Sequence, residues 1–166
     1  MEISTSISLL AVCISFLAYL FSKKSWMETY RPIVTARIET YASGNDAAIF
    51  KIVVYNSGNR PAVNIRLITN TDMLEKLFLK STEDIFKKEI LACFSEVGLI
   101  PLLHSGGTTN NGFGISGKKE STLVYGASIP IVISYKDLNG RSYKTKQTLL
   151  FRDTTYFAGS GWPEKV

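Results

Sequence analysis

The chain has 166 residues, of which 45% are hydrophobic and 20% charged, and its formal net charge is +5. This composition is typical of an ordinary folded protein and excludes a disordered or collagen-like chain. The basic residues are scattered, with no dense run and no interleaved aromatic residues, so we expect no nucleic-acid binding. The length left after an apolar N-terminus is sufficient for one domain with a hydrophobic core.

The N-terminus begins with an uncharged segment, residues 3–22, that contains no glycine or proline. Twenty helical residues rise about 30 Å, which is the thickness of the hydrocarbon core of a bilayer. A cleaved signal peptide is the alternative, but it needs a positive start and small residues at a cleavage site. Here the start carries Glu2 and the segment ends in bulky residues. The sequence therefore favours an uncleaved transmembrane anchor over residues 1–25, followed by a juxtamembrane linker over residues 26–30.

Aromatic and basic residues follow the apolar segment. Tyr19 and Trp26 flank Lys23 and Lys24, an arrangement typical of a membrane interface. Because the positive charge lies on the C-terminal side, the positive-inside rule places the soluble domain in the cytoplasm. Cys93 is the only cysteine after the anchor, which fits a reducing compartment. We expect a single-pass protein of the inner (plasma) membrane, with the lipid bilayer as one partner.

The soluble part contains a series of short segments rich in β-branched and aromatic residues, bounded by turn signals. Within residues 62–69, Val63, Ile65 and Leu67 alternate with other residues and are expected on one face of a strand. The predicted strands are residues 33–40, 47–56, 62–69, 98–103, 121–125, 129–135 and 143–151.

The last two of these strands flank residues 136–141 (KDLNGR). Asn139-Gly140 is a preferred pair for a tight hairpin turn, because both central residues of such a turn need positive φ. Residues 129–151 are therefore predicted to form an antiparallel hairpin.

The middle of the chain predicts a helical insertion. Residues 81–84 (STED) resemble a capping box, and apolar residues recur with helical spacing after them, so a helix is expected over about 82–96. Residues 72–80 fit either a helical turn or a strand, and residues 105–117 are expected to form a polar loop rich in glycine and asparagine. The apolar residues of the predicted helix are Ile85, Phe86, Ile90, Cys93, Phe94 and Val97.

About seven strands with one helical insertion indicate a mainly β fold, an antiparallel β-sandwich. Residues 54–65 resemble the "N-x-G-x-x-x-A-x-N-V" crossing between the sheets of bacterial immunoglobulin-like domains. Residues 131–143 are similar to the "Y-x-D-x-x-G-x-x-Y" hairpin near the end of such domains. The resemblance is to bacterial membrane-anchored immunoglobulin-like β-sandwich proteins of uncharacterised function. It implies a sandwich over residues 31–152 and a C-terminal tail over 153–166, carries no catalytic residue, and leaves the inserted helix as a departure from the pattern.

One glycine-rich motif and one histidine are candidates for chemistry. Residues 112–117 match G-x-G-x-x-G, but a nucleotide site needs a strand before this motif and a helix after it, whereas the following segment is predicted as a strand. His104 is the only histidine and cannot form a zinc site or a triad alone. We therefore expect no enzyme activity, no cofactor and no metal. A loop of this kind can still contact a ligand or partner. The contact residues assigned to it are Gly112, Phe113, Gly114, Lys118 and Lys119.

The tail carries Tyr156, Phe157 and Trp162, which either dock into a partner or cover the edge of their own domain. The leading expectation is a non-catalytic, membrane-tethered interaction or assembly module whose partner is another membrane-associated protein. Tethering raises the effective concentration of such a module for its partner. The alternative is a sensor of a small, nucleotide-like ligand, or a membrane effector, that signals through the single helix. The sequence gives no oligomeric state.

Overall fold

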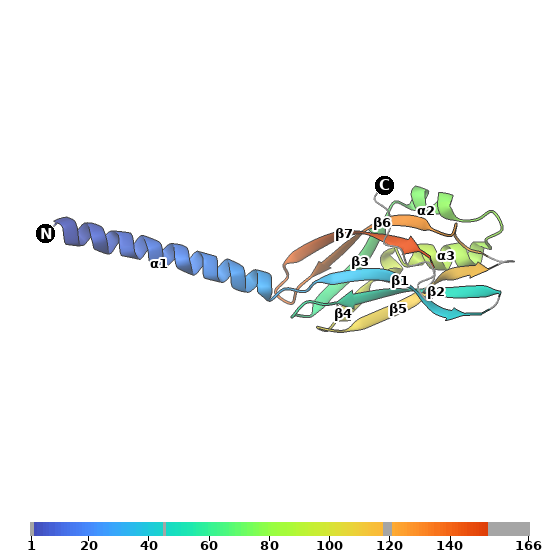
Figure 1. Cartoon of the computed structure of the whole chain (residues 1–166), viewed down its shortest axis with the longest axis horizontal. Coiled ribbons are helices and arrows are strands. Elements are labelled where there is room, and N and C mark those ends of the chain that lie inside the picture. Colours follow the sequence, from blue (N-terminus) through green and yellow to red (C-terminus); the bar gives the residue numbers. More distant parts are fainter. Residues whose placement is uncertain (1, 45, 118–120, 153–166) are drawn as a thin grey trace. The chain divides into compact units, whose positions relative to one another are not determined.

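The computed structural model describes residues 2–44, 46–117 and 121–152. The chain divides after Arg31 into two compact units (Figure 1). The first unit is a single helix, α1 (Glu2–Thr29), which confirms the predicted helix and extends it beyond Ser22. The helix thus includes most of residues 26–30, which were predicted as a juxtamembrane linker, because no helix-breaking residue occurs before Pro32.

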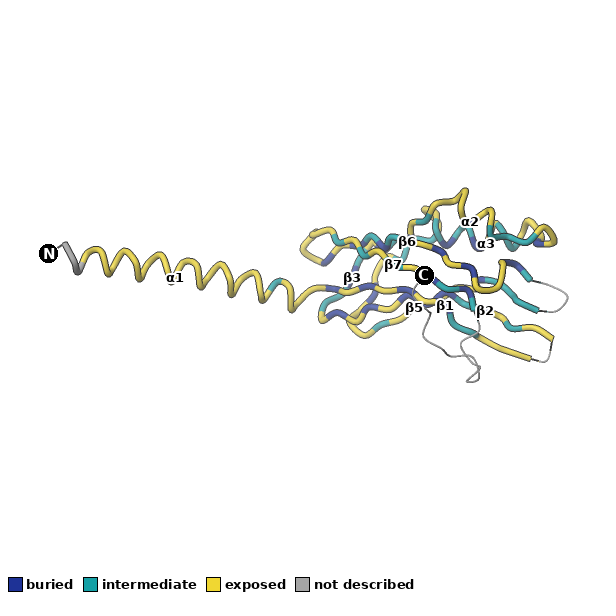
Figure 2. The backbone as a smooth tube through the Cα atoms, turned by 45° about the horizontal axis from the view of Figure 1, so that its top comes forward, coloured by how far each residue is buried: buried dark blue, intermediate teal, exposed yellow. Residues whose placement is uncertain are grey.

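The second unit contains two antiparallel sheets, which confirms the mainly β fold with an N-terminal apolar helix. One sheet has the strand order β1-β2-β5 and the other β4-β3-β6-β7. The inward side chains of both sheets form one core, around which buried and exposed residues alternate along the strands (Figure 2). The strands are β1 (Val34–Ser43), β2 (Ala47–Asn56), β3 (Ala62–Thr69), β4 (Ile100–Leu103), β5 (Thr108–Gly117), β6 (Ala127–Lys136) and β7 (Ser142–Phe151).

The predicted bounds of β2 and β3 are confirmed, but the predicted faces of β3 are partly wrong. Asn64 has a φ of 52°, and the register with β6 shifts between Val63 and Arg66. Asparagine is one of the few residues that adopt this left-handed conformation readily. The irregularity shifts the alternation of inward and outward side chains by one residue, so that Ala62 rather than Val63 is buried with Ile65.

The β6–β7 hairpin is confirmed, with a different turn from the one predicted. Lys136 pairs with Ser142, so the connection is a five-residue loop, residues 137–141. Gly140 has a φ of 81°, whereas Asn139 does not have positive φ. The side chain of Asp137 organises the loop instead, since its Oδ1 accepts hydrogen bonds from the backbone N–H of Asn139 and of Arg141, each at 2.9 Å.

The predicted polar loop at residues 105–117 is wrong, because most of it forms β5. This strand pairs with β2 along its whole length, with one irregularity beside Phe50. Phe113 is completely buried, with its ring centroid 6.0 Å from that of Phe94 and 6.4 Å from that of Phe151. Pairing and one deeply buried aromatic ring thus outweigh a local sequence rich in turn-forming residues.

The strand predicted at residues 121–125 is also wrong. Its residues make only isolated bridges, Ser116 to Ser121 and Phe78 to Leu123. Leu123 is nevertheless completely buried and belongs to the core. The segment therefore contributes packing without continuing either sheet.

The helical insertion consists of α2 (Thr71–Leu77), α3 (Asp84–Ala92) and a 3-10 turn, η1 (Glu96–Gly98). The ambiguous residues 72–80 are thus mainly helical. The predicted helix at 82–96 exists over a shorter range, and two of its apolar residues do not face the core, since Ile85 and Val97 are exposed.

The capping box predicted at residues 81–84 does not form. Glu83 precedes α3 and makes no side-chain capping bond. Thr82 is buried, and its hydroxyl donates to the carbonyl of Thr122 at 2.8 Å. A tertiary hydrogen bond has therefore replaced the local one, because a buried hydroxyl needs a partner.

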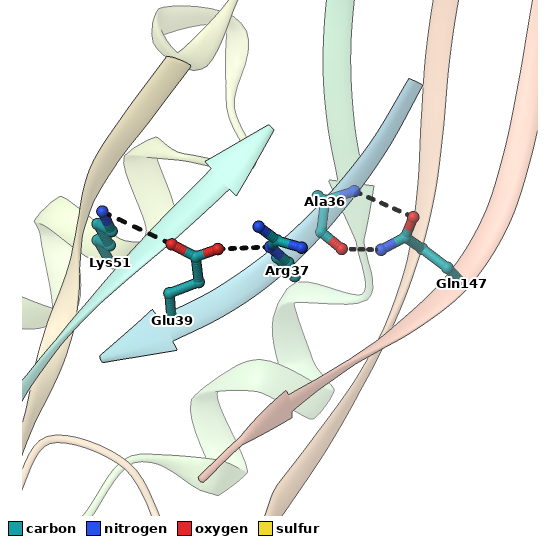
Figure 3. A network of polar contacts seen from close by, with 5 residues as sticks. All are labelled: Ala36, Arg37, Glu39, Lys51 and Gln147. Carbon is teal, nitrogen blue, oxygen red and sulfur yellow. Dashed lines mark hydrogen bonds and ion pairs between the residues drawn. The ribbon is translucent and has the colours of Figure 1, made fainter. Parts of the chain in front are cut away.

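A side chain connects the two sheets along one edge (Figure 3). The Gln147 side chain, on β7, accepts a hydrogen bond from the Ala36 backbone N–H at 3.1 Å and donates to the carbonyl of the same residue. It thereby pairs with β1 as a neighbouring strand would. On β1 the Glu39 carboxylate bonds to Arg37 and lies 3.6 Å from the Lys51 ammonium. The edge of β1 is thus protected from pairing with another chain.

Candidate functional site

The first candidate functional element is α1, taken by itself. The most apolar part of its segment Thr5–Thr29 has a mean hydropathy of 1.9, and none of that part is buried (Figure 2). Tyr19, Lys23, Lys24 and Trp26 are all helical and exposed. The helix therefore presents an apolar surface that the described residues leave uncovered, followed by two adjacent positive charges.

The second candidate is the end of the β domain at which the chain enters it after α1. We call it the tether end. It comprises the start of β1 and three loops, residues 57–61, 104–107 and 137–141. Strand pairing places them together, because Tyr55 is opposite Thr108 and Val63 is opposite Lys136.

Asn56, at the end of β2, holds this region together. Its side chain is completely buried. Its Oδ1 accepts from the backbone N–H of Ile33 and of Gly58, each at 3.1 Å. Its amide donates to the carbonyls of Arg60 at 2.8 Å, Leu103 at 3.2 Å and His104 at 3.2 Å. One side chain thus binds the start of the domain to two of the loops.

The hairpin loop is fixed by a second buried polar residue, Asp137. Tyr143 donates its hydroxyl to Oδ2 of Asp137 at 3.1 Å, and its ring stacks on Tyr135. Partial burial raises the pKa of Tyr143, and the hydrogen bond to Asp137 adds to this. Tyr135 in turn donates to the carbonyl of Pro32 at 3.3 Å. The carboxylate is therefore committed to the loop rather than available for chemistry.

A hollow of about 200 Å³ lies beside Cys93, between β2, β5 and the segment after α3. Burial raises the pKa of the Cys93 thiol, and the amide of Asn111, 3.5 Å from Sγ, opposes this in part. Since the thiolate is the reactive form, a raised pKa makes this thiol a poor nucleophile.

A hollow of about 160 Å³ lies at the end of the domain opposite the tether end, and three of the hydroxyl groups that line it have partners. Thr82 donates to the carbonyl of Thr122, Thr122 to that of Ile115, and Ser121 to that of Gly117. Both hollows are smaller than the roughly 300–1,000 Å³ typical of small-molecule sites. Neither has the size of a typical ligand pocket.

The residues assigned to a contact loop do not form one. Gly112, Phe113 and Gly114 lie in β5, and a Cβ at Gly114 would approach the Thr122 hydroxyl to 2.2 Å. The G-x-G-x-x-G motif is therefore part of a strand and does not open a helix. The remaining predicted contacts, Lys118, Lys119, Tyr156, Phe157 and Trp162, lie outside the described residues.

His104 directly follows β4 and is exposed. Over the described residues, no group of three or more His, Cys, Asp or Glu side chains is placed to hold a metal. Among the polar residues that organise the domain, Asp137 was expected to take part in the packing of the hairpin, whereas the roles of Asn56 and Gln147 were not predicted. The signal for Asn56 and Asp137 was their place in the two motifs that resemble immunoglobulin-like domains.

A comparison with curated proteins gives no match. A family model described as "Domain of unknown function (DUF8453)" matches residues 3–155, so the match includes both the apolar helix and the β domain. Since this is most of the 166 residues, the chain belongs to that family.

Proposed function

We propose that this protein is a single-pass, membrane-tethered interaction module without catalytic activity. The observation that carries the proposal is the exposed apolar surface of α1, whose most apolar part is not buried by any of the residues that the structure describes. In water such a surface is unfavourable by about 25 cal/mol per Å² of apolar area. A bilayer removes this cost, and the apolar residues 3–22 have the length needed to cross it.

The adjacent charges favour one orientation. Lys23 and Lys24 follow the apolar stretch, so the β domain belongs on the cytoplasmic side of an inner (plasma) membrane. The thiol of Cys93 is free, as expected in a reducing compartment. The arrangement of two antiparallel sheets supports the immunoglobulin-like type of sandwich.

The state of the polar side chains supports a role in binding rather than catalysis. Asp137 is engaged by its own loop, and Cys93 is buried with a raised pKa. Every described buried side-chain nitrogen or oxygen has a hydrogen-bond partner. A catalytic cysteine acts as a thiolate, which a lowered pKa favours, whereas burial raises the pKa of Cys93 and keeps its thiol protonated. The partner we propose is another membrane-associated protein, for which a tether supplies effective concentration.

A nucleotide-like sensor has less support. Its motif lies within β5, and the hollows described above are small.

Membrane extraction tests the tether. We expect the full chain to stay in the membrane pellet in alkaline carbonate. A variant with Leu10→Arg and Val12→Arg should move to the supernatant, because each arginine at a helix centre costs roughly 2.5–3.5 kcal/mol of insertion. The matched control is Leu10→Ala with Val12→Ala, which should stay in the pellet. Extraction of the unaltered chain would contradict the tether.

Cross-linking in intact membranes tests the interaction. A form in which residues 2–29 are replaced by an unrelated single-span helix should capture the same partner as the unaltered chain. Loss of the partner from this form, with the β domain still folded, would show that the domain is not the binding module.

A further inference from the structure

The charges of the β domain are distributed unevenly between its ends. The tether end carries Arg60, Lys136 and Arg141, of which Lys136 and Arg141 are exposed. Its one carboxylate, Asp137, is only 4% exposed and accepts hydrogen bonds from its own loop. The outward charge of this end is therefore positive.

The other described acidic residues of the domain lie elsewhere, on the β1–β2 hairpin or on the segment from α2 to η1. An external surface that approaches the tether end would therefore contact exposed basic residues of the domain, with no exposed acidic residue of its described part among them. These other acidic residues are Glu39, Asp46, Asp72, Glu75, Glu83, Asp84, Glu89 and Glu96.

An exposed apolar side chain lies among the basic residues. Leu138, in the loop between β6 and β7, is 68% exposed, and Lys136 and Arg141 flank it in sequence. Its backbone is rigid, because Gly140 N–H donates to the Asp137 carbonyl at 3.0 Å and the Asp137 side chain binds two further N–H groups. A basic rim around an apolar tip is the chemistry of a surface that meets anionic headgroups and the edge of the acyl region.

Chain length favours the start of β1 as the part of the domain that meets the membrane. Only residues 30–33 separate the last residue of α1, Thr29, from the first of β1, Val34. The five steps of chain from Thr29 to Val34 span at most about 18 Å. The far end of β1, at Ser43, is a ten-residue strand away, which is about 33 Å. Electrostatic attraction to lipid extends only about 8–10 Å at physiological salt, so it favours contact through the tether end, which the short linker keeps nearest to α1 along the chain.

We propose that the tether end is a membrane-docking surface that binds anionic phospholipid headgroups. Arg60, Lys136 and Arg141 contact the phosphates, and Leu138 enters the interfacial region. This inference rests on the proposed membrane tether and adds to it a defined second contact with the bilayer. Each basic residue near an anionic surface contributes roughly fivefold to the docking equilibrium, so removing all three weakens docking on the order of a hundredfold.

Fluorescence quenching in nanodiscs tests the surface in the full chain. An environment-sensitive NBD probe is attached to Leu138→Cys or, as the far-end comparison, to Ser43→Cys, each in a Cys13→Ser background. Cys93 is 5% exposed and should not react. In discs with about 30% phosphatidylglycerol, headgroup spin labels should quench the probe at position 138 at least about twofold more than the probe at position 43. Discs of phosphatidylcholine alone should abolish this difference.

Charge variants identify the contacts. Arg60→Gln, Lys136→Gln and Arg141→Gln together should reduce quenching at position 138 to the far-end level, with the domain still folded by circular dichroism. The matched control removes three lysines from the helical segment and should leave quenching unchanged. The control substitutions are Lys76→Gln, Lys80→Gln and Lys88→Gln.

A third probe separates the two proposals. NBD on the native Cys13 should be quenched by acyl-chain spin labels if α1 crosses the bilayer. Quenching at Cys13 with equal quenching at positions 138 and 43 would overturn the docking surface and leave the tether. Absence of quenching at Cys13 would overturn the tether itself.

Discussion

Replacing Asn56 with alanine should destabilise the β domain more than any change of an exposed asparagine. The side chain is completely buried and reaches five backbone groups, of which two donate to Oδ1 and three accept from the amide. The amide has only two hydrogens, so the three carbonyls share two protons and the side chain makes about four hydrogen bonds.

The expected loss follows from that number. A hydrogen bond contributes about 1 kcal/mol net, and a backbone group left unsatisfied on burial costs about 1–3 kcal/mol. Because loops near a surface regain some water, we expect a total loss of about 4 kcal/mol. With an unfolding entropy of about 2.1 cal/mol/K per residue over about 120 residues, this lowers Tm by roughly 16 °C.

The measurement is urea and thermal unfolding of the full chain in detergent micelles, followed by the β-sheet signal in circular dichroism. Asn110→Ala is the matched control, because Asn110 is exposed on β5, and it should change the free energy of unfolding by less than about 0.5 kcal/mol. If Asn56→Ala lost less than about 1 kcal/mol, the five contacts would not hold the tether end and the reasoning would be refuted.

Burial raises the pKa of Cys93, so at alkaline pH the folded chain keeps the thiol proton after the unfolded chain has lost it. The free energy of unfolding should therefore fall as pH rises above about 9. In urea titrations, Cys93→Ala should make this fall smaller. Gly114→Ala should cost about 3 kcal/mol, because the new Cβ would be 2.2 Å from a threonine hydroxyl at a φ of 133°, whereas Gly112→Ala has open space and should be nearly neutral in the same assay. Gln147→Glu should cost about 1–3 kcal/mol, since a carboxylate cannot donate to the Ala36 carbonyl; equal unfolding midpoints at neutral pH would contradict this.

The strands that could be predicted from the sequence are those whose signal is local. Residues 47–56 are dense in β-branched and aromatic side chains, and they form β2 with the predicted bounds. The hairpin of β6 and β7 was equally clear, because two such runs flank a turn sequence. The error in the turn itself arose because Asp137 supplies hydrogen bonds that make a longer loop stable.

The failures of prediction have a different origin, since they depend on distant residues. β5 has the composition of a loop and becomes a strand by pairing with β2. Thr82 was predicted to be part of a helix cap, but its hydroxyl donates a hydrogen bond to the carbonyl of Thr122, which is 40 residues away in the sequence. Asn56 and Gln147 bind backbone groups of other strands, which no spacing in the sequence reveals.

The way the tether end is built agrees with the surface proposed for it. Backbone groups in a region poor in water need partners within the protein, because an unsatisfied N–H or carbonyl there is expensive. At the tether end these partners are supplied by buried side chains: Asn56 serves the first two loops, and Asp137 serves the third. A loop that exposes Leu138 at its tip while its own N–H groups are bound by Asp137 can enter a lipid interface without leaving those groups unpaired. Rigid loops also lose little conformational entropy on docking. Three basic residues and one leucine are then sufficient for a weak contact, because the tether raises the effective concentration of the domain at the membrane.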